Sequence, residues 1–309
     1  MPNDSDTNRP SSQSVFDTKH LMTDLKARAV RGGIATMLGQ GDQFIIQIAS
    51  TIIMARLLVP ADFGLIAMVT AITGFAILFK DLGLSMATVQ RSKITHEQVS
   101  TLFWINVTVS TVITLVIFGL APAIAWFYGE PRLTLITMVL SLVFVLGGLT
   151  VQHQALMQRE MRFKALAIIR VISILAGLIA AIAFALIGIS YWALVIMQIT
   201  TAMFNTAGVW LLCHWRPSHP FRRVDVKDLL VFGANLTGFD IVNYFARNLD
   251  NILLGRFWGA NVLGLYSKAY SIMMLPINQI RAPLNAVAIP TLSRLQNDPT
   301  SDLRDIISS

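Results

Sequence analysis

Charged residues are scarce in this sequence of 309 residues. Asp, Glu, Lys and Arg together make up 13% of it, whereas roughly 25% of an ordinary soluble domain is charged. Hydrophobic residues account for 54%, which is more apolar surface than a single globular core can hide. The composition therefore argues against a soluble globular protein and indicates a membrane protein.

Cysteine is almost absent as well. The single Cys213 has no second cysteine with which to form an internal disulfide. Together with His214 and His219 it would make an incomplete metal site, because a third or fourth convincing ligand is missing. The sequence also has no nucleophile elbow, no metal-binding histidine pair and no phosphate-cradling glycine loop. We therefore expect no metal, no cofactor and no enzymatic activity.

Long apolar runs are what the sequence does contain. A transmembrane helix needs about 20 mostly apolar residues to cross the hydrocarbon layer, and about eight such stretches follow one another. They cover residues 34–58, 63–88, 99–121, 133–152, 166–187, 190–213, 229–256 and 261–288. The sequence thus predicts an all-α polytopic membrane protein with about eight transmembrane helices.

The formal net charge of +7 is a topology signal. The basic residues form short clusters between apolar runs, so we expect no nucleic-acid partner. With a cytoplasmic N-terminus, only Arg56, Arg132 and Arg256 lie near outer helix ends, and the positive-inside rule then fixes the orientation. The inner clusters contain Arg9, Lys19, Lys26, Arg28, Arg31, Arg91, Lys93, Arg159, Arg162, Lys164, Arg216, Arg222, Arg223, Lys227, Arg294 and Arg304.

Loop lengths define the expected domains. The outer loops, 59–62, 122–132, 188–189 and 257–260, are too short to house a catalytic domain. The inner segment 214–228 contains two prolines and four cations, so it divides the chain. We expect a cytoplasmic polar tail and interfacial segment (1–30), a six-helix N-terminal lobe (31–213), a cytoplasmic linker (214–228), the first two helices of a second lobe (229–289) and a cytoplasmic segment (290–309).

An internal repeat crosses that linker. Shifting the sequence by 200 residues places Arg56 on Arg256, and the pair Gly64-Leu65 on Gly264-Leu265. Each arginine is followed eight residues later by Gly-Leu after a short turn. Duplicated bundles are common in transporters, which hold substrate between two halves and open alternately to each side. The first pair of spans and the seventh and eighth spans are therefore expected to be related.

Four segments carry a resemblance to a known family. They read ARLLVPADFGL at 55–65, FKDLGLSMATVQR at 79–91, LDNILLGRFWGANVLGLYSKAY at 249–270 and IPTLSRLQ at 289–296. In these segments the sequence resembles the polysaccharide flippases and exporters of the O-antigen and colanic-acid type. That family belongs to the multidrug, oligosaccharidyl-lipid and polysaccharide transporter superfamily.

The resemblance implies a transporter of the bacterial inner membrane. It would flip or export lipid-linked oligosaccharide or polysaccharide precursors, of the undecaprenyl pyrophosphate type, by alternating access. Membrane lipids and other polysaccharide-assembly proteins are the further partners that it implies. Members of the family carry more helices than this chain, so we expect the chain to be a truncated form.

Ionic residues within the predicted spans mark the candidate site. Each would cost about 2.5 to 3.5 kcal/mol if it faced lipid at mid-depth, so they must face protein or a watery cavity. On the seventh span Thr237, Asp240, Asn243, Arg247 and Asp250 share one helical face. The eighth span repeats this pattern from Lys268, and the first has an uncharged stripe that includes Gln43, Gln47 and Ser50.

These stripes give a substrate-site hypothesis. Cations matched to phosphate offset its desolvation, so Arg247 and Lys268 are expected to bind the pyrophosphate. Asp42 and Asp240 are candidates for binding a coupling proton or sodium ion. The structural alternative is that Asp240, Arg247 and Asp250 only pair with one another and hold helices together. The expected cavity residues are Arg247, Lys268, Asp240, Asn243, Asp250, Gln43 and Gln47.

Three other functions compete with polysaccharide export. A multidrug cation antiporter of the same superfamily would need a cavity dominated by acidic and aromatic residues. The cations Arg247 and Lys268 within the predicted spans argue against this function. A polytopic glycan polymerase or glycosyltransferase would need larger loops outside the membrane. A truncated chain could also act as a scaffold that transports nothing.

Overall fold

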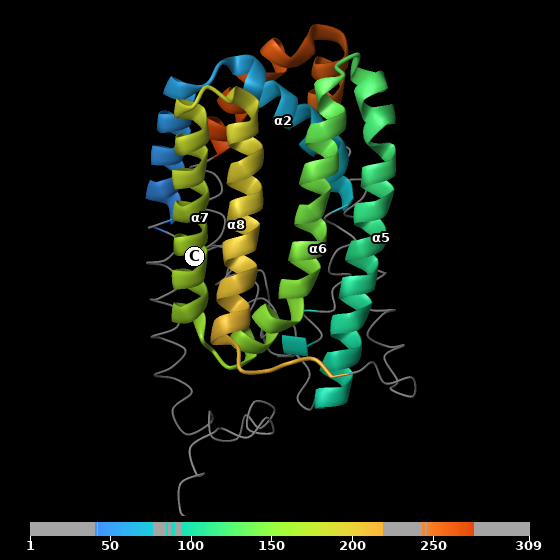
Figure 1. Cartoon of the computed structure of the whole chain (residues 1–309), viewed down its shortest axis with the longest axis vertical. Coiled ribbons are helices and arrows are strands. Elements are labelled where there is room, and N and C mark those ends of the chain that lie inside the picture. Colours follow the sequence, from blue (N-terminus) through green and yellow to red (C-terminus); the bar gives the residue numbers. More distant parts are fainter. Residues whose placement is uncertain are drawn as a thin grey trace, which may run out of the picture. The chain divides into compact units, whose positions relative to one another are not determined.

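Four long helices dominate the computed structural model. They are α5 (His96–Tyr128), α6 (Arg132–Arg159), α7 (Phe163–Leu186) and α8 (Ser190–Leu212), shown in Figure 1. All four are long and apolar enough to cross a membrane. The prediction of an all-α polytopic membrane protein is confirmed. The structure describes residues 41, 43–76, 85, 88–89, 94–218, 243–244 and 246–274.

Shorter helices precede and follow these four. Gln43–Leu57 leads into α2 (Pro60–Thr73), which continues as the 3-10 turn η2 (Gly74–Ala76). Proline at the first position of α2 suits a helix start, and the Asp62 carboxylate accepts a hydrogen bond from the Val59 N–H at 3.3 Å. Residues 246–274 are also helical, with a left-handed backbone at Gly259 (φ 78°).

The chain divides into two compact units, Met1–Gly264 and Leu265–Ser309. Most of the predicted linker 214–228 lies outside the described residues, so the six-helix lobe remains a prediction. All contacts discussed below between helices fall within the first unit.

Two predicted helix ends were wrong. The third span was expected to end at residue 121, but α5 continues to Tyr128 with Pro122 inside it. Proline is tolerated within membrane helices because neighbouring groups satisfy the freed carbonyl. The turn to α6 is therefore only Gly129–Pro131 long, with Gly129 left-handed at φ 68°. α6 in turn runs past residue 152 to Arg159, because its polar residues Gln152 and His153 are fully buried against other helices.

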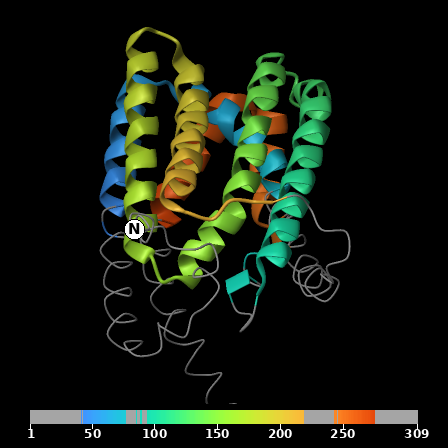
Figure 2. The ribbon, with the colours of Figure 1, turned by 60° about the horizontal axis from the view of Figure 1, so that its bottom comes forward.

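Small residues let neighbouring helices approach closely. α5 pairs with α6, and α7 pairs with α8, as two antiparallel hairpins seen in Figures 1 and 2. Gly148 of α6 lies directly against Ser110 of α5, and Gly177 of α7 lies against Thr201 and the Met197 carbonyl of α8. Close packing at small residues is the usual source of helix association in lipid, where no hydrophobic driving force exists.

Hydrogen bonds to backbone carbonyls join the two hairpins. On α8, the Thr206 hydroxyl donates to the Leu146 carbonyl of α6 at 3.2 Å. One turn further, the Trp210 indole N–H donates to the Leu149 carbonyl at 3.1 Å. α6 and α8 are therefore adjacent, and they link the pairs α5–α6 and α7–α8.

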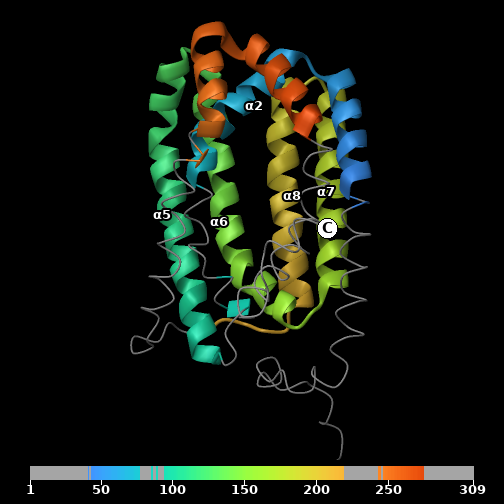
Figure 3. The same ribbon diagram turned by 180° about the vertical axis from the view of Figure 1, so that it is seen from behind.

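The Gln43–Leu57 helix packs on the α7–α8 pair, as Figure 3 shows from behind. Met54 and Leu58 at its end, with Phe63 of α2, form a buried cluster with residues of α7 and α8. The α7 and α8 members are Leu178, Ala181, Ala193 and Leu194.

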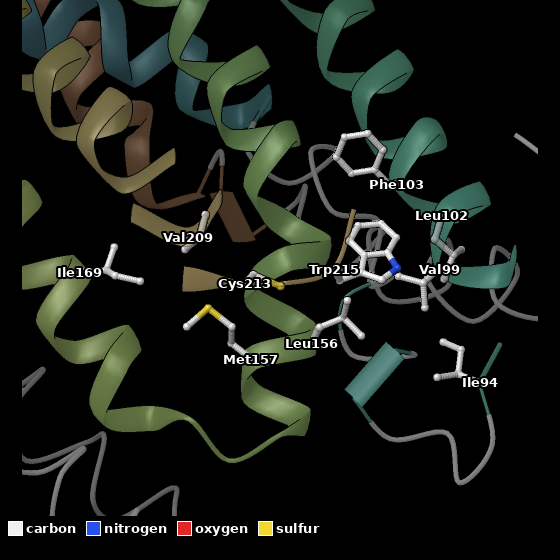
Figure 4. Close-up of a cluster of buried hydrophobic side chains, with 10 residues drawn as sticks. All are labelled: Ile94, Val99, Leu102, Phe103, Leu156, Met157, Ile169, Val209, Cys213 and Trp215. Carbon is white, nitrogen blue, oxygen red and sulfur yellow. The ribbon is translucent and has the colours of Figure 1, made fainter. Parts of the chain in front are cut away.

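The extended residues 213–218 after α8 cross to the beginning of α5. Trp215 is 1% exposed and lies in a cluster with Phe103 and Leu156, shown in Figure 4. Its indole N–H donates to Nδ1 of His96 at 3.0 Å. Ser218 closes the crossing, because its N–H donates to the Ser100 hydroxyl at 3.2 Å. The strap formed by residues 213–218 therefore connects α8 to α5 without a covalent crosslink.

Cys213 begins this strap. Its side chain is buried in the same cluster as Trp215. Cys213 is thus part of the core.

Tyr244 fastens the seventh predicted span to α2. Its hydroxyl lies 3.0 Å from both the Thr70 and Ala71 carbonyl oxygens. The Tyr244 ring also lies 6.3 Å from the ring of Phe75, measured between centroids. This contact holds the helix that carries Arg247 to α2.

Replacing Gly177 with Val should destabilise the protein by about 1 to 3 kcal/mol, because the added side chain would collide with Thr201 and the Met197 carbonyl. The measurement is the thermal unfolding midpoint of the purified protein in detergent. Gly119→Val is the matched control, since no other group lies within 4 Å of the added Cβ. Equal midpoints for the two variants would contradict the close α7–α8 contact.

Replacing Tyr244 with Phe should cost about 1 kcal/mol, because the ring stays and only the hydrogen bonds to α2 are lost. Thermal unfolding in detergent should show a midpoint lowered by a few degrees. Tyr191→Phe serves as the control, since the Tyr191 hydroxyl has no hydrogen-bond partner among the described residues. An unchanged midpoint for Tyr244→Phe would show that the hydroxyl contributes nothing to docking.

Candidate functional site

The predicted site residues fall into two groups. Asp42 and Asp240, the predicted ion-coupling residues, lie outside the described residues, and their roles stay predictions. The described members are Gln43, Gln47, Asn243, Arg247, Asp250 and Lys268.

The structure brings Arg247 and Asn243 together. Both side chains are exposed, and Arg247 Nε donates a hydrogen bond to Asn243 Oδ1 at 3.2 Å. The two residues are four apart on one helix, which places them one turn from each other on the same face. The neutral amide orients the guanidinium without neutralising it.

Two other arginines in the described part of the chain form ion pairs with glutamates. Arg132 pairs with Glu130 at 2.8 Å, and Arg162 pairs with Glu160 at 3.5 Å. Neither pair involves Arg247. Asp250, one turn beyond Arg247, accepts a hydrogen bond from the Asn251 N–H at 2.8 Å. The described residues therefore include no Arg247–Asp250 ion pair, although Asp240 was also part of that structural alternative.

The Glu130–Arg132 pair lies where α5 turns into α6. Its charge-assisted hydrogen bond lowers the pKa of the Glu130 carboxyl. The side chains are 24% and 47% exposed, so solvent screens the pair and its contribution to stability is small. We assign it a role in holding the turn and none in the site.

The glutamine stripe on the first described helix faces protein at one end. Gln43, Gln47, Ser50 and Met54 share a helical face. Ser50 contacts the Met197 sulfur of α8 at 4.0 Å, and Met54 is buried against α7 and α8. Towards the other end, Gln43 is half-buried and Gln47 is exposed. The amides of Gln43 and Gln47 therefore lie beyond the packed end of this helical face and are at least partly exposed.

Lys268 belongs to the second compact unit. Its side chain is half-buried, and its carbonyl accepts a hydrogen bond from the Ser271 hydroxyl at 2.8 Å. Ser271 is the next member of the stripe predicted for the eighth span. The two residues therefore share a helical face, as expected.

Sequence reasoning missed polar groups on α6 and α8. The Gln154 amide approaches Asn205 Oδ1 at 3.5 Å, joining the two helices. Gln152 accepts a hydrogen bond from the Thr88 hydroxyl at 2.8 Å. These amides lie near or within apolar spans, and that position was the available signal. The signal is weak because an uncharged amide costs less free energy to bury than an ionic group.

The described candidate residues carry functional groups that suit anions and hydroxyls. The guanidinium of Arg247, which makes no ion pair with another described residue, offers a planar fork of donors that matches phosphate oxygens. Amide groups such as Asn243 and Gln47 can both donate and accept hydrogen bonds, which suits hydroxyl-rich ligands. Among these residues, the structure brings Arg247 and Asn243 into contact.

Known proteins show where this chain belongs. It is 31% identical to the lipopolysaccharide biosynthesis protein WzxC of Escherichia coli (strain K12), over 82% of this chain and 51% of that protein. It is also 31% identical to the teichuronic acid biosynthesis protein TuaB of Bacillus subtilis (strain 168), over 72% of this chain and 46% of that protein. The succinoglycan biosynthesis transport protein ExoT of Rhizobium meliloti (strain 1021) is 25% identical, over 85% and 53% respectively.

The chain spans about half the length of these curated relatives. No solved structure matches it significantly. The profile of a family described as "Polysaccharide biosynthesis protein" matches residues 53–307, which is most of the chain. That range includes α2, all four long helices and the helix that carries Arg247. This multi-pass membrane protein therefore belongs to the polysaccharide biosynthesis protein family.

Proposed function

We propose that the protein moves lipid-linked oligosaccharide or polysaccharide precursors across the bacterial inner membrane, without making or breaking covalent bonds. The observation that carries the proposal is the state of Arg247. Its guanidinium is exposed and hydrogen-bonded to the neutral Asn243, on a helix of a protein of this family. A cation within a membrane span is costly unless it has an anionic partner or water.

The pyrophosphate that links lipid to sugar is the partner that we assign to Arg247. A guanidinium binds two phosphate oxygens at once, and this charge-assisted contact offsets the desolvation of the anion. Lys268 is the second cation predicted for the same group. Asn243, Gln43 and Gln47 would hydrogen-bond sugar hydroxyls, with Asp250 as a further acceptor. Undecaprenyl pyrophosphate is the lipid carrier implied by the family resemblance.

Transport requires two arrangements of the helices. Substrate binding favours one arrangement only if its contacts there are stronger than in the other. The six-helix lobe and the repeated helix pair are the bodies that we propose to rock against each other. Asp42 and Asp240 are the proposed sites for a coupling proton or sodium ion. We further propose a cytoplasmic N-terminus, because the distribution of cations between the predicted spans favours that orientation.

Replacing Arg247 with Ala should abolish surface polysaccharide, because the pyrophosphate would lose its main counter-charge. The test uses a bacterial strain whose surface polysaccharide depends on this gene, and it measures polysaccharide at the cell surface and protein in the membrane. Arg247→Lys should retain partial export, since the charge remains but the paired hydrogen bonds are lost.

Arg256→Ala is the matched control. Arg256 lies on the same helix, but its guanidinium stacks over the Phe127 ring at 5.7 Å. We expect normal export from this variant. Normal export by Arg247→Ala, at an unchanged protein level, would overturn the assignment of Arg247.

A further inference from the structure

Two glycines 200 residues apart make reciprocal backbone contacts. Gly64 of α2 lies so close to Ala260 that an added Cβ would overlap the Ala260 carbonyl. Gly264 lies in the same way against the Pro60 carbonyl. All four residues belong to the first compact unit. The segments Pro60–Gly64 and Ala260–Gly264 therefore touch through their main chains.

The pairing has the form of a two-fold contact. Adding 200 to Pro60 and Gly64 gives Ala260 and Gly264. Gly64 contacts the carbonyl of Ala260, and in the equivalent contact Gly264 meets the carbonyl of Pro60. In an isologous interface residue i contacts j while j contacts i, and the internal repeat satisfies this rule within one chain. The backbone breaks also correspond, with Val59 extended before α2 and Gly259 left-handed before Ala260.

This contact lies at the end of the bundle where α5 turns into α6. Gly255 packs against the Tyr128 ring near the end of α5, and Arg256 covers the neighbouring Phe127. This is the end that the charge distribution predicts to be outside the cell membrane. The reciprocal contact thus joins the first helix pair to the repeated pair on the predicted outer side.

A contact made only by backbone atoms can separate and form again. Glycine Cα–H groups facing carbonyl oxygens form weak attractions that recur where helices cross closely. Since no side chain of either glycine interlocks with the opposite helix, the two segments can part without rearranging rotamers. They can also meet again in the same register, because the carbonyls fit only a position without a Cβ.

We propose that the Pro60–Gly64 and Ala260–Gly264 segments form the outer gate of the transporter, closed in this structure and parted when the site opens outward. The proposal rests on the alternating-access function proposed above. A side chain at residue 64 or 264 would hold the closed contact apart. It would therefore shift the protein toward the outward-open arrangement.

The test measures access to the proposed site from outside. Asn243→Cys, next to Arg247, is the reporter in a Cys213→Ala background, and intact spheroplasts are treated with a membrane-impermeant maleimide. Gly64→Val and Gly264→Val should each raise the labelling rate about tenfold, since overpacking opposes only the closed state. The double variant should add little, because both substitutions remove the same contact.

Gly119→Val is the control, because no other group lies within 4 Å of a Cβ at this position, and its labelling rate should stay unchanged. If a valine variant does not accumulate in the membrane, Gly64→Ala and Gly264→Ala replace it, with the same direction expected. Unchanged or slower labelling in folded variants would overturn the gate. Labelling needs no substrate, so this failure is distinct from a failure of the Arg247 export test.

Discussion

Close approach of helix backbones is the interaction on which this arrangement depends. Lipid tails are as apolar as leucine side chains, so burial of apolar surface drives helix association weakly in a membrane. Contact must come from tight packing and hydrogen bonds to carbonyls. Gly148 and Gly177 permit that packing within the hairpins, and Thr206 and Trp210 supply hydrogen bonds between them. The same device recurs at Gly64, where it joins two repeats.

The spans of the long helices could be predicted because their signal is physical and local. About 20 apolar residues in a row have few alternatives to a membrane helix. The ends were harder. Pro122 was expected to lie beyond the end of the third span, yet α5 continues through it to Tyr128. The fourth span was expected to end at Gln152, yet α6 buries Gln152 and His153 and continues to Arg159. Each depends on neighbours that are distant in sequence, which periodicity does not reveal.

The candidate site was predictable in composition but not in detail. The spacing of Asn243 and Arg247 placed them on one face, and the structure agrees. Spacing alone left open whether Arg247 pairs with an acid or with an amide. It also gave no sign that Tyr244 would reach the carbonyls of Thr70 and Ala71, because that contact joins residues more than 170 positions apart. The cost of burying charge points to the helix that carries Arg247 as part of a candidate site. The partner of each charged side chain depends on tertiary contacts.

The strap of residues 213–218 changes where the chain leaves the four-helix core. Its anchors, His96 and Ser100, lie at the beginning of α5, so the path to the following helices starts there and not at the end of α8. His96 accepts a hydrogen bond from the Trp215 indole N–H at Nδ1, and its Nε2 lies 3.2 Å from the Ser218 hydroxyl. Force applied at Ser218 would therefore load the beginning of α5 before the end of α8, through the hydrogen bonds to His96 and Ser100.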